Sequence, residues 1–316
     1  MNININLKMK FNKYKKLSGD ASFRSFYRTK SSIIVHSKKN KISNLLIYDA
    51  VNKLLNKNKI IAPKLISNQY SKNFIEIEDF GDETVFNLIS RNKRGKVLVF
   101  KKILNLLIKI QKIKNVKIKT FKKKYYQIPN YTNKKLLDEA GLFYEWYLKK
   151  NLNLNNRKKI KSELNNIFKN LLNKLELKKN VFVHRDFHIS NIMVNNNELA
   201  LIDSQDAVFG NQAYDLASLI DDVRIETSLT FKKKLLKEYF KINKNINKKK
   251  LINDFEILSV LRNFKIIGIF KRLSIRDKKH KYLKLIPYAW KLINNRINNS
   301  NFKELNSFLK KLKYKE

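Results

Sequence analysis

The chain has 316 residues, 43% of them hydrophobic, and its 69 Lys and Arg against 26 Asp and Glu give a formal net charge of +43. This length and apolar share exclude a disordered chain and suffice for one large domain or two lobes with a real core. The absence of cysteine excludes disulfides and thiolate metal sites, as suits a reducing cytoplasm.

The positive charge would attract polyanions, so a nucleic-acid partner has to be weighed. The lysines are spread over almost every helix-like segment, and no Arg-rich block with interleaved aromatic residues stands out. We therefore interpret the lysines as a solvated basic surface. We expect the protein to bind an anionic small molecule such as ATP and not a nucleic acid. The N-terminus alternates Ile and Asn, and the apolar run at 103–110 is broken by Asn and Lys. We expect a cytoplasmic monomer with no membrane association.

Residues 17–36 predict two strands, at 23–28 and 33–36, after a small-residue turn at 19–22. Such a turn can place backbone N–H groups over phosphates, although most turns of this kind only connect a hairpin. Arg24 and Arg28 are four residues apart and share one face of the strand, where they could meet phosphate or a carboxylate.

The pattern then predicts a helix at 40–58, a strand beginning at 62 and another at 74–77. The last of these ends in an acidic link, Glu78-Asp79-Phe80-Gly81-Asp82, which is either a connection between lobes or an ordinary strand-to-helix turn. From Thr84, a candidate helix cap, the pattern is mainly helical. We expect helices at 85–90, 97–112, 134–150 and 156–177, an irregular connection at 119–129, a loop near 241–250, and Trp290 in the core.

Residues 181–206 hold the strongest candidate site. An apolar run leads into His184-Arg185-Asp186, Asn191 follows, and a turn at 195–197 returns the chain so that a second apolar run ends at Asp203. Phosphoryl transfer needs a divalent metal on hard oxygen ligands and a carboxylate for the attacking hydroxyl. A lone HRD triplet occurs by chance, but Asn at this offset and Asp after the next hairpin predict convergence of the three side chains.

This pattern resembles the catalytic loop and metal-binding segment of the protein-kinase-like superfamily. The resemblance implies that Asp186 is the catalytic base and that Asn191 and Asp203 bind Mg²⁺. It also implies that Asp215, at the start of a later helix, bonds back to the loop and holds His184 and Arg185 in shape. By the same resemblance, backbone groups around Glu78 to Phe80 would bind adenine.

A narrower resemblance rests on GDASFRSFYR at 19–28, IEDFGD at 77–82, LFYEWYL at 142–148, VHRDFHISNIMV at 183–194 and LIDSQDAVFGNQAYDLASL at 201–219. Together they are similar to the aminoglycoside-phosphotransferase-like branch of that superfamily. The similarity implies an α+β, two-lobed protein-kinase-like fold. A small N-terminal antiparallel-sheet lobe would span 1–79, and a larger, mainly helical lobe would span 80–316.

Within that branch the chain resembles bacterial cell-wall amino-sugar kinases that phosphorylate the anomeric hydroxyl of N-acetylmuramate and N-acetylglucosamine in peptidoglycan recycling. The resemblance implies ATP and Mg²⁺ as cofactors and a sugar 1-phosphate as product. Sugar hydroxyls and the N-acetyl group need paired donors and acceptors. Our candidates for those contacts are Glu145, His188, Gln205 and Asp206.

The chain departs from the wider kinase pattern in one respect. The strand at 33–36 ends in His36 rather than in the lysine that normally binds the α- and β-phosphates, so we assign those contacts to Ser22 and Arg24. A nucleotide-binding pseudokinase is the non-enzyme alternative, disfavoured because Asp186, Asn191 and Asp203 are all present. Aminoglycoside and choline- or homoserine-type small-alcohol phosphotransferases also remain, although Gln205 and Asp206 favour a sugar over a quaternary cation.

Overall fold

The computed structural model describes residues 11, 13–17, 24–91 and 95–312. Residue contacts divide the chain into two units: residues 1–128 with 189–207, and residues 129–188 with 208–316. We describe each unit separately, and the predicted lobe boundary after residue 79 stays a prediction. In the described part of the chain, no helix combines the length and the apolar character that crossing a membrane requires.

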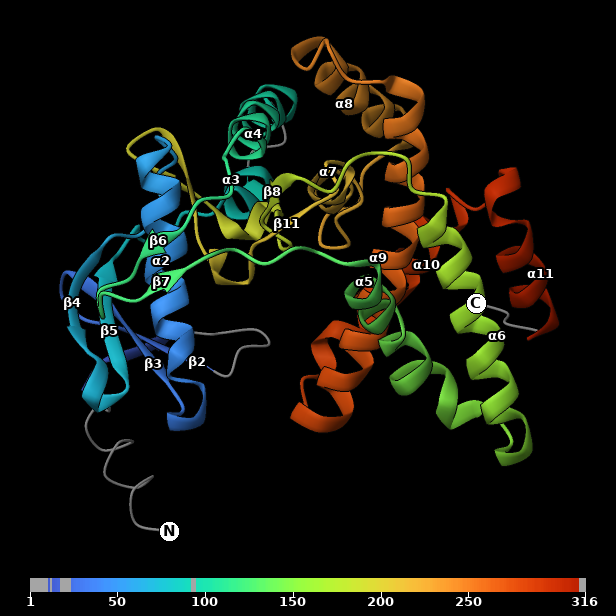
Figure 1. Ribbon diagram of the computed structural model, residues 1–316, viewed down its shortest axis with the longest axis horizontal. Helices are drawn as coiled ribbons and strands as arrows, with labels where there is room; N and C mark the ends of the chain where they lie inside the picture. The colour runs from blue at the N-terminus through green and yellow to red at the C-terminus, as the bar shows by residue number, and fades with distance from the viewer. Residues whose placement is uncertain (1–10, 12, 18–23, 92–94, 313–316) are drawn as a thin grey trace. The chain divides into compact units, whose positions relative to one another are not determined.

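The first unit contains a five-stranded antiparallel sheet in the order β1-β2-β3-β5-β4 (Figure 1). Its strands are β1 (Lys15–Leu17), β2 (Arg24–Arg28), β3 (Ser32–Ser37), β4 (Leu65–Gln69) and β5 (Phe74–Glu78). Helix α2 (Ser43–Lys57) packs on this sheet, because Leu45 and Tyr48 of the helix are buried with Val35, Ile75 and Ile77 of β3 and β5. This packing places one face of β2 and β3 toward α2.

The same unit holds α3 (Val85–Arg91), α4 (Lys96–Gln111), β6 (Ile118–Lys119), β7 (Tyr125–Tyr126) and the hairpin β9 (Ile192–Asn195)–β10 (Glu198–Leu201). Asn196 and Asn197 both have positive φ, at 47° and 63°, which is the conformation that a tight two-residue hairpin turn requires. The predicted turn at 195–197 is therefore confirmed. The hairpin is anchored by backbone bridges from Ile61 to Ala200 and from Thr84 to Met193.

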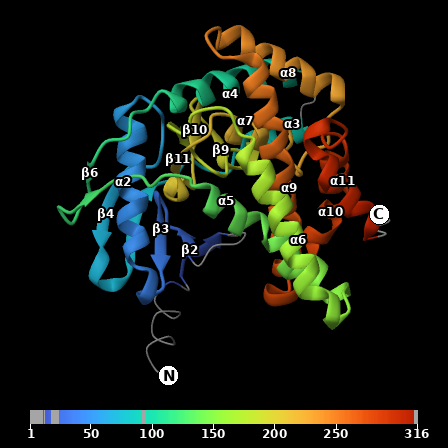
Figure 2. The same cartoon turned by 45° about the vertical axis from the view of Figure 1, so that its right-hand side comes forward.

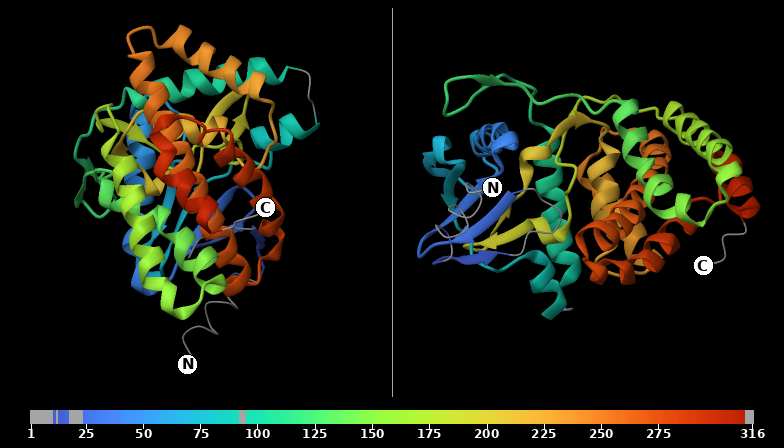
Figure 3. Two further views of the ribbon diagram at one scale, coloured as in Figure 1. Left: turned by 90° about the vertical axis from the view of Figure 1, so that its right-hand side faces the viewer. Right: turned by 90° about the horizontal axis from the view of Figure 1, so that it is seen from below.

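The second unit is mainly helical (Figures 2 and 3). Its elements are α5 (Asn133–Ala140), α6 (Leu154–Asn173), β8 (Val181–Val183), β11 (Val208–Gly210), α7 (Ala213–Ile220), α8 (Leu229–Ile242), α9 (Lys248–Asp277), α10 (Ile286–Asn294) and α11 (Lys303–Lys311). The 30-residue helix α9 is its centre, since α5, α6, α7 and α10 all contact it. Trp290 is buried and donates to the Tyr147 hydroxyl at 3.2 Å, so its predicted place in the core is confirmed.

Short helical segments complete the chain. The 3₁₀ turns are Lys39–Lys41, Tyr70–Lys72, Lys149–Asn151, Ile189–Asn191, Ser204–Asp206, His280–Leu285 and Ser300–Phe302, and Tyr144–Leu148 forms a π-helix. The sequence predicts one helix over 134–150, and the structure has α5, a turn residue at Gly141, two more helical residues and then the π turn. At Gly268 of α9 a Cβ atom would lie 2.4 Å from the Leu142 carbonyl, so α9 approaches this irregular backbone directly.

The other predicted helices match α2, α3, α4 and α6, with ends that differ by a few residues. Thr84 caps α3, as predicted, because its hydroxyl accepts from the Asn87 N–H at 3.1 Å. The chain between α8 and α9 is a short loop, in the region where the Lys- and Asn-rich run predicts one. The α+β class is confirmed, with the five-stranded sheet in one unit and the long helices of the other around α9.

Candidate active site

The β9–β10 hairpin places two predicted metal ligands of the first unit side by side. Asn191 ends the 3₁₀ turn before β9 and Asp203 follows β10, and the Ile202 N–H donates to the Asn191 carbonyl at 3.1 Å. Asp203 has a left-handed backbone, with φ 62° and ψ 35°, and its side chain is 39% exposed. Positive φ is uncommon for a residue other than glycine, and such residues cluster at functional sites.

Arg24 is the cation of this half-site. Its guanidinium is buried and donates from Nη2 to Asp203 Oδ1 at 3.0 Å and from Nη1 to Asn44 Oδ1 on α2 at 3.1 Å. Gln205 Nε2 bridges Asp203 Oδ1 and Asp206 Oδ2, both at 3.0 Å. Four of the predicted site residues, Arg24, Asp203, Gln205 and Asp206, thus form one hydrogen-bonded cluster with Asn191 adjacent.

The register of β2 against β3 explains why Arg24 rather than His36 reaches this cluster. Arg24 pairs with Ser37, whereas His36 pairs with Ser25 and therefore projects from the opposite face. The ring centroid of His36 lies 5.8 Å from that of Phe11, which in turn packs edge-on against Phe74. Burial lowers the pKa of His36. Ser22, predicted to contact phosphate, lies outside the described residues.

Arg28 braces the acidic link that follows β5. Its guanidinium contacts Asp79 Oδ2 at 2.5 Å and Asp82 Oδ1 at 2.7 Å, and it donates to the Gly81 carbonyl at 2.9 Å. Glu78, predicted to contact adenine, accepts the Lys64 N–H through its carboxylate at 3.0 Å, and Phe80 is half-buried. Arg24 and Arg28 therefore both meet carboxylates, one of the two alternatives that the sequence leaves open.

The second unit contains the loop that begins at His184. The buried Asp215 carboxylate, in the first turn of α7, accepts the His184 N–H at 2.6 Å and the Arg185 N–H at 3.1 Å. Arg185 has φ 74°, a conformation unfavourable for a residue with a side chain. Burial raises the pKa of Asp215 to about 7, against the opposing effect of these two donors.

The charges around Asp186 keep it ionised. Burial alone would raise the pKa of Asp186, but the positive charges of Lys265, Arg185 and Arg262 outweigh burial and hold it well below its usual range. Glu139 organises two of these cations, because its carboxylate pairs with Arg185 and, at 2.7 Å, with Lys265 Nζ. Asp186 is therefore a carboxylate at neutral pH, as a proton acceptor must be.

Two predicted sugar-binding residues also belong to the second unit. His188 is buried, donates its backbone N–H to the Asp186 carbonyl at 3.0 Å, and has its pKa lowered to about 3, chiefly by burial. Glu145 lies in the π turn and pairs with Lys161 at 2.5 Å and Lys149 at 3.6 Å. His188 thus lies beside the candidate base, whereas Glu145 is engaged with surface lysines.

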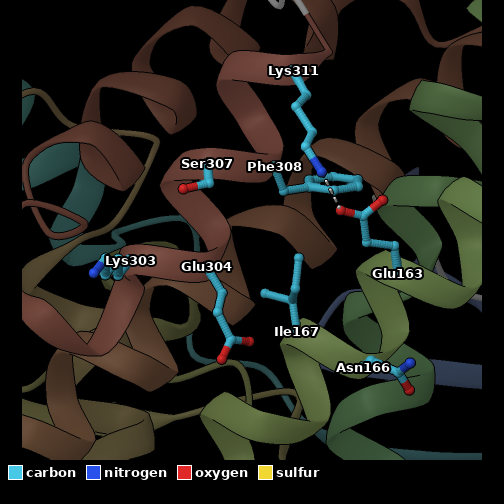
Figure 4. Close-up of a pocket in the computed structure, with 8 residues that line it drawn as sticks. All are labelled: Glu163, Asn166, Ile167, Lys303, Glu304, Ser307, Phe308 and Lys311. Carbon is cyan, nitrogen blue, oxygen red and sulfur yellow. Dashed lines mark hydrogen bonds and ion pairs between the residues drawn. The ribbon is translucent and has the colours of Figure 1, made fainter.

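The structure therefore gathers the predicted residues in two groups, one in each unit. Asn44, Glu139 and Lys265 escape prediction, because each acts through a partner distant in the chain and no local pattern marks it. A groove of about 430 Å³ between α6 and α11 of the second unit is lined by Glu163, Asn166, Ile167, Lys303, Glu304, Ser307, Phe308 and Lys311 (Figure 4). None of the predicted site residues lines it.

A model of the phosphotransferase enzyme family matches residues 13–247, well over half of the chain. The chain belongs to this family. It is therefore a phosphotransferase with an alcohol group as acceptor. The assignment confirms the sequence prediction of the family.

Curated relatives in this phosphotransferase family include an N-acetylmuramate/N-acetylglucosamine kinase of Neisseria meningitidis, 27% identical over 283 residues, which cover 85% of this chain and 81% of the relative. A Pseudomonas putida protein of the same name is 25% identical, covering 88% and 81%. Among solved structures, the ADP-bound aminoglycoside phosphotransferase APH(2'')-Ib superposes with a TM-score of 0.59 at 16% identity, covering 92% of this chain and 95% of that one. The similarity confirms the kinase-like fold predicted from the sequence.

Proposed function

We propose that this phosphotransferase transfers the γ-phosphoryl group of Mg-ATP to the anomeric hydroxyl of N-acetylmuramate or N-acetylglucosamine. The observation that carries the proposal is the similarity, over most of the chain, to relatives named as kinases of these two sugars. The product would be a sugar 1-phosphate, as expected of a cytoplasmic, monomeric enzyme of peptidoglycan recycling. Nucleotide use is supported by the ADP bound to the similar phosphotransferase structure.

In the proposed reaction Asp186 is the base. Its carboxylate takes the proton of the anomeric hydroxyl while the hydroxyl oxygen bonds to the γ-phosphorus and the bond from phosphorus to the bridging oxygen breaks, leaving ADP. The charges of Lys265, Arg185 and Arg262 lower its pKa against burial and keep it ionised, as a group that accepts a proton has to be. Asp215 would act as a positioning residue, since it holds the backbone on which Asp186 lies.

We assign Asn191 and Asp203 to Mg²⁺. Carboxylate and amide oxygens are the hard donors that this ion prefers, and the hydrogen bond from Ile202 to Asn191 keeps the two residues adjacent. The ion would supply charge neutralisation at the phosphate oxygens. Asp186 and Asn191 are five positions apart, so the chain itself limits their separation to at most about 18 Å.

The nucleotide contacts are assigned to Arg24 and Ser22 for the phosphates and to backbone groups from Glu78 to Phe80 for adenine. The buried Arg24 supports the first assignment, because its planar fork binds phosphate in two-point fashion and it already adjoins Asp203. The ion pairs of Arg28 with Asp79 and Asp82 support the adenine assignment, because they hold in place the backbone that would bind the base.

For the sugar we assign Gln205, Asp206 and His188 as hydrogen-bonding residues, and Glu145 as a fourth candidate. The Gln205 amide links Asp203 and Asp206, so it adjoins the proposed metal site. Glu145 has competing partners in Lys161 and Lys149, and sugar binding would have to displace them. Substitution of each residue by Ala should raise KM for sugar more than KM for ATP if the assignment is right.

A substrate panel tests the proposal. Purified protein is given Mg-ATP with N-acetylmuramate, N-acetylglucosamine, kanamycin or choline, ADP release is followed, and the product is identified by phosphorus NMR. We expect turnover of the amino sugars with an anomeric phosphate. Turnover of the antibiotic or of choline alone would assign the enzyme to one of the alternative acceptors, and nucleotide binding without any turnover would support the pseudokinase.

A further inference from the structure

Arg262 of α9 is a buried cation, and one nitrogen of its guanidinium lacks a hydrogen-bond acceptor among the described residues. Its side chain is only 5% exposed, and within the described residues its buried Nη1 atom has no hydrogen-bond acceptor. The carboxylates of Asp186, Asp215 and Asp222 interact with the charge of Arg262, but a buried N–H donor without an acceptor still costs free energy. An anion supplied from outside the chain would remove that penalty.

Two neighbours on α9 fix where Arg262 lies. Ser259, one turn earlier, donates to Asp221 Oδ2 at 2.6 Å, and Lys265, one turn later, pairs with Glu139 at 2.7 Å. Residues three apart share one face of a helix. Arg262 therefore projects between the end of α7 at Asp221 and the Glu139 cluster that adjoins the catalytic loop.

The groups around Arg262 describe a small polar site beside the proposed base. The charge of Arg262 lowers the pKa of Asp186, His188 and Asp222, although burial and the charge of Lys265 or Arg224 have larger effects. Asp222 accepts from the backbone N–H and from Nη1 of Arg224, both at 3.0 Å, and the Arg224 side chain is 26% exposed. A second, more accessible guanidinium thus lies at this site, although Asp222 and Asp186 would repel an anion that came too close.

The two proposed acceptors differ in the chemistry that such a site would recognise. N-acetylmuramate carries a lactyl carboxylate that N-acetylglucosamine lacks, and a carboxylate is the natural partner of a guanidinium fork. We propose that Arg262, with Arg224 beside it, forms a carboxylate-binding subsite of the acceptor pocket and makes the enzyme prefer N-acetylmuramate. This inference rests on the proposed amino-sugar kinase function.

The first arm of the test uses the unmodified enzyme. We compare kcat/KM for N-acetylmuramate, its neutral methyl ester and N-acetylglucosamine under the same Mg-ATP concentration. A charged hydrogen-bonded pair in a partly desolvated site predicts that the acid exceeds the ester by about 10- to 100-fold, with the difference in KM. An ester used as well as the acid would overturn the subsite.

The second arm uses Arg262→Gln, with Arg276→Gln as a matched control on the same helix, where Arg276 is exposed and pairs with Asp277. We expect Arg262→Gln to lower the ratio of kcat/KM for N-acetylmuramate to that for N-acetylglucosamine by about 10- to 100-fold, because any effect of the lost charge on Asp186 falls on both sugars alike. An equal loss for both sugars would mean that Arg262 serves Asp186 or the transferred phosphoryl group, and would refute the proposal. If the unmodified enzyme uses neither sugar, the proposed function itself fails; if it uses both without regard to the carboxylate, only the subsite fails.

Discussion

Arg24 Nη2 lies 3.0 Å from Asp203 Oδ1, although the two residues are 179 positions apart in the chain. The other terminal nitrogen of the same guanidinium, Nη1, donates a hydrogen bond to Asn44 of α2. The strand β3 has His36 where a phosphate-binding lysine is expected, and the sheet register turns that histidine away from α2. The neighbouring strand β2 therefore supplies a cation beside the proposed metal ligand.

Arg24→Gln should weaken Mg-ATP binding by about 10- to 100-fold, because one charge-assisted, two-point contact to phosphate is lost. Arg24→Lys, which keeps the charge but not the planar fork, should recover part of that affinity. Calorimetric titration with Mg-ATP measures both variants. Arg91→Gln is the control, because it removes an exposed pair with Glu83 and a hydrogen bond to the Asn87 carbonyl. Normal nucleotide binding by Arg24→Gln would show that Arg24 does not contact the phosphates.

Asp215→Ala should lower kcat with little change in KM and should destabilise the fold by about 2 to 4 kcal/mol. Two buried backbone donors, from His184 and Arg185, lose their acceptor, and the left-handed backbone of Arg185 loses its support. Denaturant unfolding and steady-state kinetics measure the two effects. Asp138→Ala, on the exposed side of α5, provides the control; wild-type kcat in folded Asp215→Ala would show that the loop holds its shape unaided.

In Lys265→Met, the fall of kcat/KM at low pH should begin at a higher pH than in the unmodified enzyme. Lys265 contributes the largest of the positive charges that lower the pKa of Asp186 against burial, so its removal raises that pKa. A base must be ionised to act, and a higher pKa therefore narrows the active range at its acid end. Rate measurements across pH, with the exposed Lys250→Met as control, test this; a fall that begins at the same pH in an active variant would contradict the electrostatic account.

Local signals predict much of the fold. The asparagine turn before Glu198 fixes the β9–β10 hairpin, because two consecutive residues with positive φ tolerate few other side chains. Apolar periodicity likewise marks α2 and α4, and Thr84 marks the start of α3. Such features depend on neighbours a few positions away, so the sequence alone suffices to locate them.

The parts that escape prediction depend on distant partners. The helix expected at 134–150 changes to a π turn after Phe143, next to the place where α9 brings Gly268 onto the Leu142 backbone. Glu139 pairs with both Arg185 and Lys265, and no pattern in the local sequence indicates these ion pairs. Sequence predicts that Arg24 could meet a carboxylate, but only the packing of the hairpin identifies it as Asp203.

The role of Asp186 is tested most directly by single-turnover transfer from Mg-ATP to N-acetylmuramate in Asp186→Asn, with nucleotide affinity measured on the same preparation. Asparagine keeps the size of the side chain but cannot accept the hydroxyl proton, so the account predicts near-normal nucleotide binding and a transfer rate reduced by about 10²- to 10⁴-fold. Transfer at the rate of the unmodified enzyme would contradict the assignment of Asp186 as the base.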